Sequence, residues 1–315
     1  MNKKLMVPKQ RKYLSKLILC FLLLIPIIGN GQVFTEISDL AAPISGTGSS
    51  NIATIDNAWS IFVNPAGLSR LKSPEIISAF HKFYGMSFLS YKVAGIAIPV
   101  NKKIGSLALS YQSNSVDYSG NILSSEDVYS FSHALYLQKD IHSTLSIGYS
   151  VNLYHLDYGK SAGTEGDGSN GIDLGEGYGF GIDLGIQGSL RERTWIGFFA
   201  KNINSPEMGS ALSSSALPRA IGIGFGYEPY YGLTTNFMIY QAFGNKSTQY
   251  RGGINYNLFP WISIRAGINT APNTVNYGFS ISKFGLKIDY AYINHPILPG
   301  TNQFSLGYTF NRNKK

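Results

Sequence analysis

Large apolar side chains alternate with small or polar ones along most of the chain, from about residue 75 to residue 310. The last stretch shows the pattern clearly in Phe304, Leu306, Tyr308 and Phe310, with Ser305, Gly307 and Thr309 between them. Because successive side chains of a β-strand point to opposite faces, this stretch has one apolar face and one polar face. Such a strand either covers a soluble core or spans a membrane with its apolar face in lipid.

Fourteen segments of this kind follow one another. They are Glu75–Tyr84, Ser87–Val100, Ile104–Ser113, Glu126–Gln138, Thr144–Asp157, Glu176–Leu190, Thr194–Asn204, Pro218–Glu228, Gly232–Phe243, Gln249–Asn257, Trp261–Asn269, Thr274–Ser282, Leu286–Asn294 and Asn302–Phe310. Their lengths suit tilted membrane strands, which need about 9–11 residues. An even number of strands also returns both ends of the chain to one side of the membrane.

The connections between these segments alternate in length. Short turns follow the even-numbered segments, as at residues 101–103, 139–143, 191–193, 229–231, 258–260 and 283–285. The opposite set contains the long loops, at residues 114–125, 158–175, 205–217 and 295–301. A soluble β-sandwich gives no reason for this segregation. We therefore predict an all-β fold, a transmembrane antiparallel β-barrel of about 14 strands over residues 75–310, with a periplasmic tail over residues 311–315.

The first 31 residues are typical of an export signal. A basic stretch precedes an apolar run from Leu17 to Ile28, and small residues follow at Gly29 and Gly31. A run of this length is well short of the ~20 residues that a spanning helix needs. Cys20, the only cysteine, lies inside the run without the small residues that a lipoprotein signal places before its cysteine. We expect residues 1–31 to be a cleavable signal peptide and the mature chain to contain no thiol.

Loss of this signal changes the charge of the protein. The full chain carries +8, but six of its 26 Lys and Arg lie in residues 1–31; the other twenty, against 18 Asp and Glu, leave +2. A basic surface for nucleic acid is therefore not indicated. Charged residues make up 14% of the chain, against about 25% in soluble domains, and 21 Tyr suit the aromatic girdles of membrane barrels. We expect outer-membrane lipid around the barrel and location in the outer membrane.

Residues 32–74 lack the alternation and contain the stretch Asp56 to Leu68. Asn64 followed by Pro65 is typical of a helix start, with a side-chain acceptor at the cap and a preset φ angle. Ala66 follows, and Gly67 is then expected to adopt the left-handed conformation that ends the turn. One interpretation is a simple N-terminal arm with a tight turn. The other is a small hatch folded into the lumen of the barrel and anchored by Trp59, Ile61, Phe62 and Leu68.

The stretch Asn64-Pro65-Ala66-Gly67-Leu68 matches the hatch motif of a known superfamily residue for residue. The whole mature chain resembles the FadL/TodX-type outer-membrane transporters and their compact relatives, the PorV/PorQ-type barrels associated with type IX secretion. FadL-type transporters have long outer segments that form a hydrophobic capture groove, whereas the longest loop here, Tyr158–Gly175, is polar and rich in glycine. This departure favours the compact PorV-like branch.

Three functions from different classes follow. The resemblance to the compact branch implies an accessory protein that docks against a secretion translocon or its cargo. The resemblance to FadL implies instead a passive transporter of hydrophobic small molecules, gated by the hatch. The third possibility is a structural barrel with an occluded lumen. An apolar pocket beside Asn64–Leu68 is the feature that favours transport.

Two groups of barrel residues have expected roles. By the alternation, Arg265, Lys287 and Asp289 point into the lumen, since Arg or Lys facing lipid at mid-depth costs about 2–4 kcal/mol. We expect them to hold the hatch or to bind a solute, and favour the first. The apolar face of the last strand, formed by Phe304, Leu306, Tyr308 and Phe310, is the expected signal for the barrel-assembly machinery.

No stretch assembles a catalytic site, and we predict neither enzyme activity nor a cofactor. The acidic loop that carries Asp167, Asp173 and Glu176 offers oxygen ligands for Ca²⁺, but Tyr178 stands where an EF-hand requires a carboxylate, so we interpret it as a solvated loop. The five histidines lie on different segments without ligand spacing, and no metal site is predicted.

Overall fold

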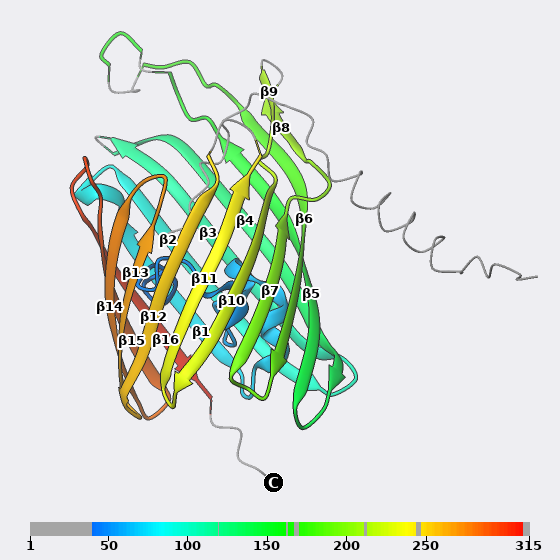
Figure 1. Ribbon diagram of the computed structural model, residues 1–315. Helices are drawn as coiled ribbons and strands as arrows, with labels where there is room; N and C mark the ends of the chain where they lie inside the picture. The colour runs from blue at the N-terminus through cyan, green and yellow to red at the C-terminus, as the bar shows by residue number, and fades with distance from the viewer. Residues whose placement is uncertain are drawn as a thin grey trace, which may run out of the picture.

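The computed structural model describes residues 40–118, 120–161, 163–166, 170–210, 213–243 and 247–310. Fourteen strands pair with antiparallel neighbours and close into one barrel, which confirms the predicted fold (Figure 1). Strands β1 (Glu75–Lys82) and β16 (Thr301–Thr309) complete the ring, with Glu75 opposite Thr309 and His81 opposite Gln303. The expected signal peptide and the tail after residue 310 lie outside the described residues.

The other barrel strands follow in chain order around the wall. They are β2 (Leu89–Asn101), β3 (Gly105–Tyr118), β4 (Asn121–Lys139), β5 (Ser143–Asp157), β6 (Glu176–Leu190), β7 (Thr194–Lys201), β10 (Ala220–Tyr230), β11 (Leu233–Ala242), β12 (Gln249–Phe259), β13 (Ile262–Asn269), β14 (Thr274–Lys283) and β15 (Leu286–Asn294). Each pairs with its neighbours in sequence, except that β7 pairs with β10 across an inserted hairpin.

Two of the predicted long loops contain strands. The stretch 114–125 continues β3 and β4 outward, with Asn114 opposite Glu126 and Tyr118 opposite Asn121, and turns at Gly120, whose φ is +81°. The stretch 205–217 holds the small hairpin of β8 (Glu207–Ser210) and β9 (Ser213–Ala216). Both stretches lack a continuous apolar face, so the alternation that identified the membrane strands is absent there. The prediction of loops at these places was wrong.

The end of the first predicted strand also differs. Residues 83–85 form a short 3₁₀ turn, η3 (Phe83–Gly85), instead of continuing β1. Tyr84 there has a φ of +55°, outside the extended region that a strand requires. Its backbone N–H donates to the Thr301 hydroxyl at 2.9 Å, which joins this turn to the start of β16.

The two faces of the wall differ in chemistry. On β16 and the residue that follows it, Phe304, Leu306, Tyr308 and Phe310 are 60%, 52%, 43% and 41% exposed on the outside, while Ser305 and Gln303 are buried inside. The same alternation runs round the barrel, with polar side chains such as Asn152, Asn276 and Ser280 buried in the lumen. An apolar outer band around a polar interior is the arrangement of barrels that cross membranes.

The lumen is filled by the segment from Leu40 to Pro74, which we call the hatch. It contains the short helices α2 (Ala42–Ser45), η1 (Asn51–Ala53), α3 (Ser60–Val63) and η2 (Pro65–Arg70). Figure 1 shows them, in dark blue, enclosed by the strands at mid-height. Among the described residues, none of the helices has the length and apolar character needed to cross a membrane.

Candidate functional site: the hatch and its seat

The hatch has too few residues for a core of its own, and it shares one with the wall. Ile44, Ala58, Trp59 and Leu68 are at most 2% exposed and pack in one apolar cluster with side chains of β1 to β4. The wall contributes Ile77, Ala79, Tyr91, Val93, Ala97, Ala108 and Ala134. Ordering the backbone costs about 1–2 kcal/mol per residue, and burial against the wall supplies the compensating apolar contact.

Asn64 bonds the hatch to itself and to the wall. Its Oδ1 accepts from the backbone N–H of Ala66 at 3.2 Å, which is the cap that the Asn-Pro pair suggests. Its Nδ2 donates to the carbonyl of Ile52 at 3.0 Å, and to the strand carbonyls of Ile186 at 3.1 Å and Phe198 at 3.3 Å. One fully buried amide therefore ties η2, η1, β6 and β7 together.

Gly67 does not have the predicted left-handed conformation, because it lies inside the helical run of η2 rather than at its end. Its lack of a side chain has another reason. A Cβ at this position would lie 2.4 Å from the carbonyl oxygen of Ile55 and 2.6 Å from the Oγ of Ser60. Gly67 is therefore needed for close packing of η2 against the preceding part of the hatch.

The hatch packs directly against glycines of the wall, mostly through its backbone. Seven inward-facing glycines would each place a Cβ within 2.1–2.6 Å of a hatch atom, and six of them, which we call the glycine collar, lie opposite one another on paired strands: Gly148, Gly185, Gly197, Gly224, Gly253 and Gly267; the seventh is Gly226. The collar glycines form three cross-strand pairs, in which Gly148 faces Gly185, Gly197 faces Gly224, and Gly253 faces Gly267. No side chain fits between hatch and wall at these places. Their signal in the sequence is glycine that recurs at inner positions of successive strands, a pattern that belongs to no short motif.

Hydrogen bonds from wall side chains also hold the hatch against the barrel. The Ser305 hydroxyl accepts from the Ala42 N–H at 3.0 Å, and the Asn276 amide donates to the Ser45 carbonyl at 2.8 Å. The Gln187 amide donates to the carbonyls of Ile52 and Ile55 at 2.9 and 3.1 Å. None of these three wall residues was singled out from the sequence, because an inner polar position is recognised as a hatch contact only when the strand register is known.

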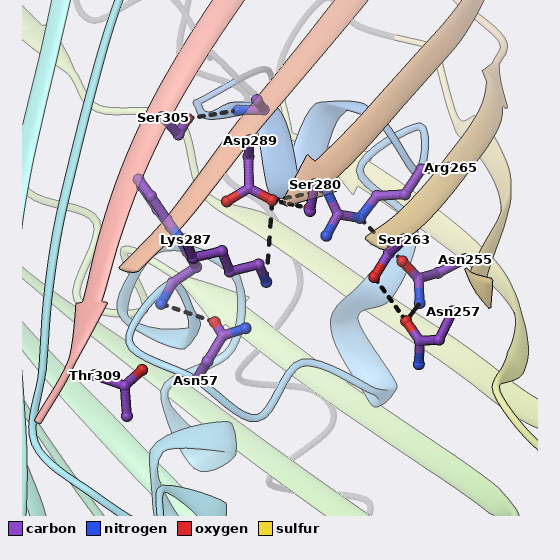
Figure 2. Close-up of polar contacts among 12 residues, drawn as sticks. Asn57, Asn255, Asn257, Ser263, Arg265, Ser280, Lys287, Asp289, Ser305 and Thr309 are labelled. Carbon is purple, nitrogen blue, oxygen red and sulfur yellow. Dashed lines mark hydrogen bonds and ion pairs between the residues drawn. The ribbon is translucent and has the colours of Figure 1, made fainter. Parts of the chain in front are cut away.

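Arg265, Lys287 and Asp289 lie together on the inner face, as Figure 2 shows. Arg265 Nη1 lies 2.9 Å and Lys287 Nζ 4.0 Å from Asp289 Oδ1, which also accepts from Ser280. Arg265 Nε donates to Asn255 at 3.0 Å. These polar contacts link strands β12 to β15 with one another. The hatch touches the cluster through packing, with Gly46 close to the Cβ of Arg265.

Two cavities lie on opposite sides of the hatch. The long-loop cavity, about 70 Å³, has Leu40, Ile61 and Phe62 of the hatch at its base. The short-turn cavity, about 330 Å³, lies toward the short turns and is bounded by Asp56 and Arg70 of the hatch. A cavity of ~150 Å³ holds a benzene-sized molecule. The smaller cavity therefore has no room for such a molecule while the hatch stays in this position.

The acidic loop gives no evidence of a cation site. Asp167 lies outside the described residues, while Asp173 accepts from the Gly175 N–H at 2.8 Å and Glu176 accepts from the Tyr178 hydroxyl at 3.0 Å. Within the described part of the chain, no three His, Cys, Asp or Glu side chains gather closely enough to hold a metal ion.

No protein-family model and no curated protein matches the chain. Solved structures do match its fold. The CymD monoaromatic hydrocarbon channel aligns with a TM-score of 0.61 at 12% identity, over 89% of this chain and 100% of that one. A Pseudomonas aeruginosa FadL homologue gives 0.57 at 10%, over 90% and 100%. The P. putida toluene transporter TodX gives 0.54 at 10%, over 87% and 100%. The structural neighbours of this barrel are thus FadL/TodX-type hydrocarbon channels.

Proposed function

We propose that the protein is a passive outer-membrane conduit for small molecules, built like the FadL-type channels and gated by the hatch. The observation that carries this proposal is the position of the hatch between two cavities, one on its long-loop side and one on its short-turn side. A molecule that crosses the lumen meets Ile61 and Phe62 first and the polar short-turn cavity last. The likeness to hydrocarbon channels supports conduction, and the apolar outer band supports the membrane location.

Gating follows from the size of the cavities. The long-loop cavity is too small for a benzene-sized passenger, so the base formed by Leu40, Ile61 and Phe62 has to move before anything passes. Phe62 and Val63 are only half-buried, whereas Asn64 to Leu68 are buried against the collar. We therefore place the moving part at residues 61–63 and the fixed part at residues 64–68.

A second candidate is a barrel whose lumen stays closed, and the glycine collar favours it. Six close contacts at the collar and the bonds of Asn64 and Gln187 hold the hatch without an evident hinge. Docking of a secretion translocon or its cargo, which the resemblance to PorV/PorQ-type barrels implies, stays a prediction. The structural likeness is to channels, and we therefore rank conduction first.

The experiment is solute influx into proteoliposomes that hold the full mature chain. Phe62→Ala removes the half-buried ring at the base of the long-loop cavity and is expected to speed influx. Tyr129→Ala, on the outer wall, is the matched control, because its ring is 50% exposed and faces away from the lumen. Influx that is absent from the wild type and from Phe62→Ala, with both proteins folded, favours the closed barrel instead.

A further inference from the structure

We infer that the passenger of this conduit is a small uncharged saccharide rather than a hydrocarbon. The inference rests on the proposed function and names the substrate class of the same lumen. It comes from the side chains that line the two cavities, which differ from those that an apolar passenger requires. A pocket for a hydrocarbon is lined by apolar groups with few polar ones.

The short-turn cavity is lined mainly by carboxamides and hydroxyls. Five asparagines border it: Asn51, Asn57, Asn236, Asn255 and Asn257. A carboxamide offers two N–H donors and a carbonyl acceptor, and this combination suits a hydroxyl group, which both donates and accepts. A hydrocarbon that entered this cavity would displace water from these groups without replacing its hydrogen bonds.

The long-loop cavity combines aromatic rings with polar groups. Phe62, Tyr91, Tyr154 and Phe199 line it beside Gln112, Asn114 and Asn152. A sugar ring has flat C–H faces that pack on aromatic rings and a rim of hydroxyls that bond to amides. The Tyr91 hydroxyl donates to Gln112 and the Tyr154 hydroxyl donates to Asn202, each at 2.8 Å, so the rings are held in place by their own polar ends.

On each side of the hatch, one asparagine has a buried side-chain oxygen that accepts no hydrogen bond from the described residues. The Oδ1 atoms of Asn114, in the long-loop cavity, and of Asn51, in the short-turn cavity, are buried and have no hydrogen-bond partner among the described residues. A buried carbonyl without a partner is destabilising, because it has lost its hydrogen bonds to water without gaining others. A passing hydroxyl that reaches these atoms as the hatch moves would satisfy them.

Several of the charged groups along the route are already paired with one another or hydrogen-bonded to neighbouring side chains. Arg70 lies 3.5 Å from Asp56, and Arg265 lies 2.9 Å from Asp289. In the long-loop cavity, Asp183 accepts from the Asn152 amide and from the Asn202 N–H, both at 2.8 Å. A charged passenger would have to break these contacts, whereas a neutral one leaves them intact.

The test compares glucose, gluconate and glucosamine, which share a carbon skeleton of similar size and differ in charge, by swelling of proteoliposomes that hold the full mature chain. Glucose is expected to enter fastest. Asn114→Leu and Asn51→Leu keep the side-chain volume but remove the acceptor, and each is expected to slow glucose about two- to tenfold, the effect of one hydrogen bond. Asn294→Leu, on the outer wall, is the control and should leave the rate unchanged.

Saturating toluene is added in a second arm and is expected to leave glucose entry unchanged. Slowing of glucose by toluene, equal rates for the three sugars, or wild-type rates in both asparagine variants would each overturn the saccharide inference while conduction still stands. Absence of influx for every solute would overturn the proposed function and the inference together, so the two failures are distinguishable.

Discussion

The Oδ1 atom of Asn64 lies directly over Gly185, where a Cβ on the glycine would be 2.1 Å away from it. Asn64 belongs to the hatch and Gly185 to the inner face of β6, so the bare backbone of the strand leaves the space that the amide occupies. From this position Asn64 reaches the carbonyls of Ile186 and Phe198. The hatch is thus fitted to the wall by missing side chains as well as by bonds.

Loss of the Asn64 side chain should loosen the hatch more than the barrel. Asn64→Ala removes a cap, worth about 1 kcal/mol, and buried donors to the hatch and the wall, worth about 1 kcal/mol each. We expect faster hydrogen exchange of the amides in residues 52–68, with little change in the strands. Asn57→Ala is the control, because Asn57 Oδ1 accepts from the Trp59 N–H at 3.1 Å but makes no hydrogen bond to the described residues of the wall. Equal effects of the two substitutions would contradict the role assigned to Asn64.

The glycine collar can be tested with neighbouring positions of β12. Gly253→Ala would place a Cβ 2.1 Å from the Thr47 carbonyl oxygen, whereas Gly252→Ala would meet only Ile268 on the outer face at 3.6 Å. Overpacking of this kind costs about 1–3 kcal/mol. We expect Gly253→Ala to increase proteolysis of the hatch in folded protein and Gly252→Ala to leave it unchanged. Similar protection in both variants would show that the hatch does not rest on this glycine.

The alternation of side chains predicted the barrel well, because it is local. Phe279 and Ile281 on β14, like Leu306 on β16, are exposed outside, and Ser280 and Ser305 are buried inside, as the sequence pattern indicates. The extension of β3 and β4 was missed because residues 114–125 carry serines where membrane strands carry apolar residues. The extended parts of β3 and β4 lie beyond the apolar band of the barrel, where the strands face water and need no apolar face.

The wall residues that contact the hatch could not be predicted from the sequence, for a different reason. Which inner residue meets the hatch depends on the register of many strands, and a slip of one residue changes the face. Gln187 and Asn276 have the same appearance in the sequence as any other polar inner residue. Gly67 shows the same limit, since its contact with Ile55 and Ser60 arises from the folded path of the hatch.

Insertion of the barrel is expected to depend on the outer face of β16. Tyr308→Asp together with Phe310→Asp places two charges on a face that is apolar from Phe304 onward. We expect the double variant to be lost from the outer membrane, measured as the yield of heat-modifiable protein in that fraction. Thr309→Asp, whose side chain is on the other phase of the strand, serves as the control. A normal yield of the double variant in the outer membrane would contradict the assembly role predicted for this strand.

The topology predicts where inserted tags are accessible. Gly166 lies in the long loop after β5, and Lys102 lies in the short turn after β2, at opposite ends of the barrel. A tag at Gly166 should be labelled by antibody on intact cells, and a tag at Lys102 only after permeabilisation. Labelling at Lys102 on intact cells would show that the barrel has the opposite orientation and that the roles of the two cavities are exchanged.

The central claim is that the hatch closes the lumen, and single-channel conductance in planar bilayers tests it most directly. Removal of residues 33–68 leaves all barrel strands in place, since β1 begins at Glu75. We predict low conductance for the full mature chain and larger, steady openings after the deletion, with the same heat-modifiable migration as evidence of a folded barrel. Equal conductance of the two folded proteins would contradict the account, because the hatch would then not be what closes the lumen.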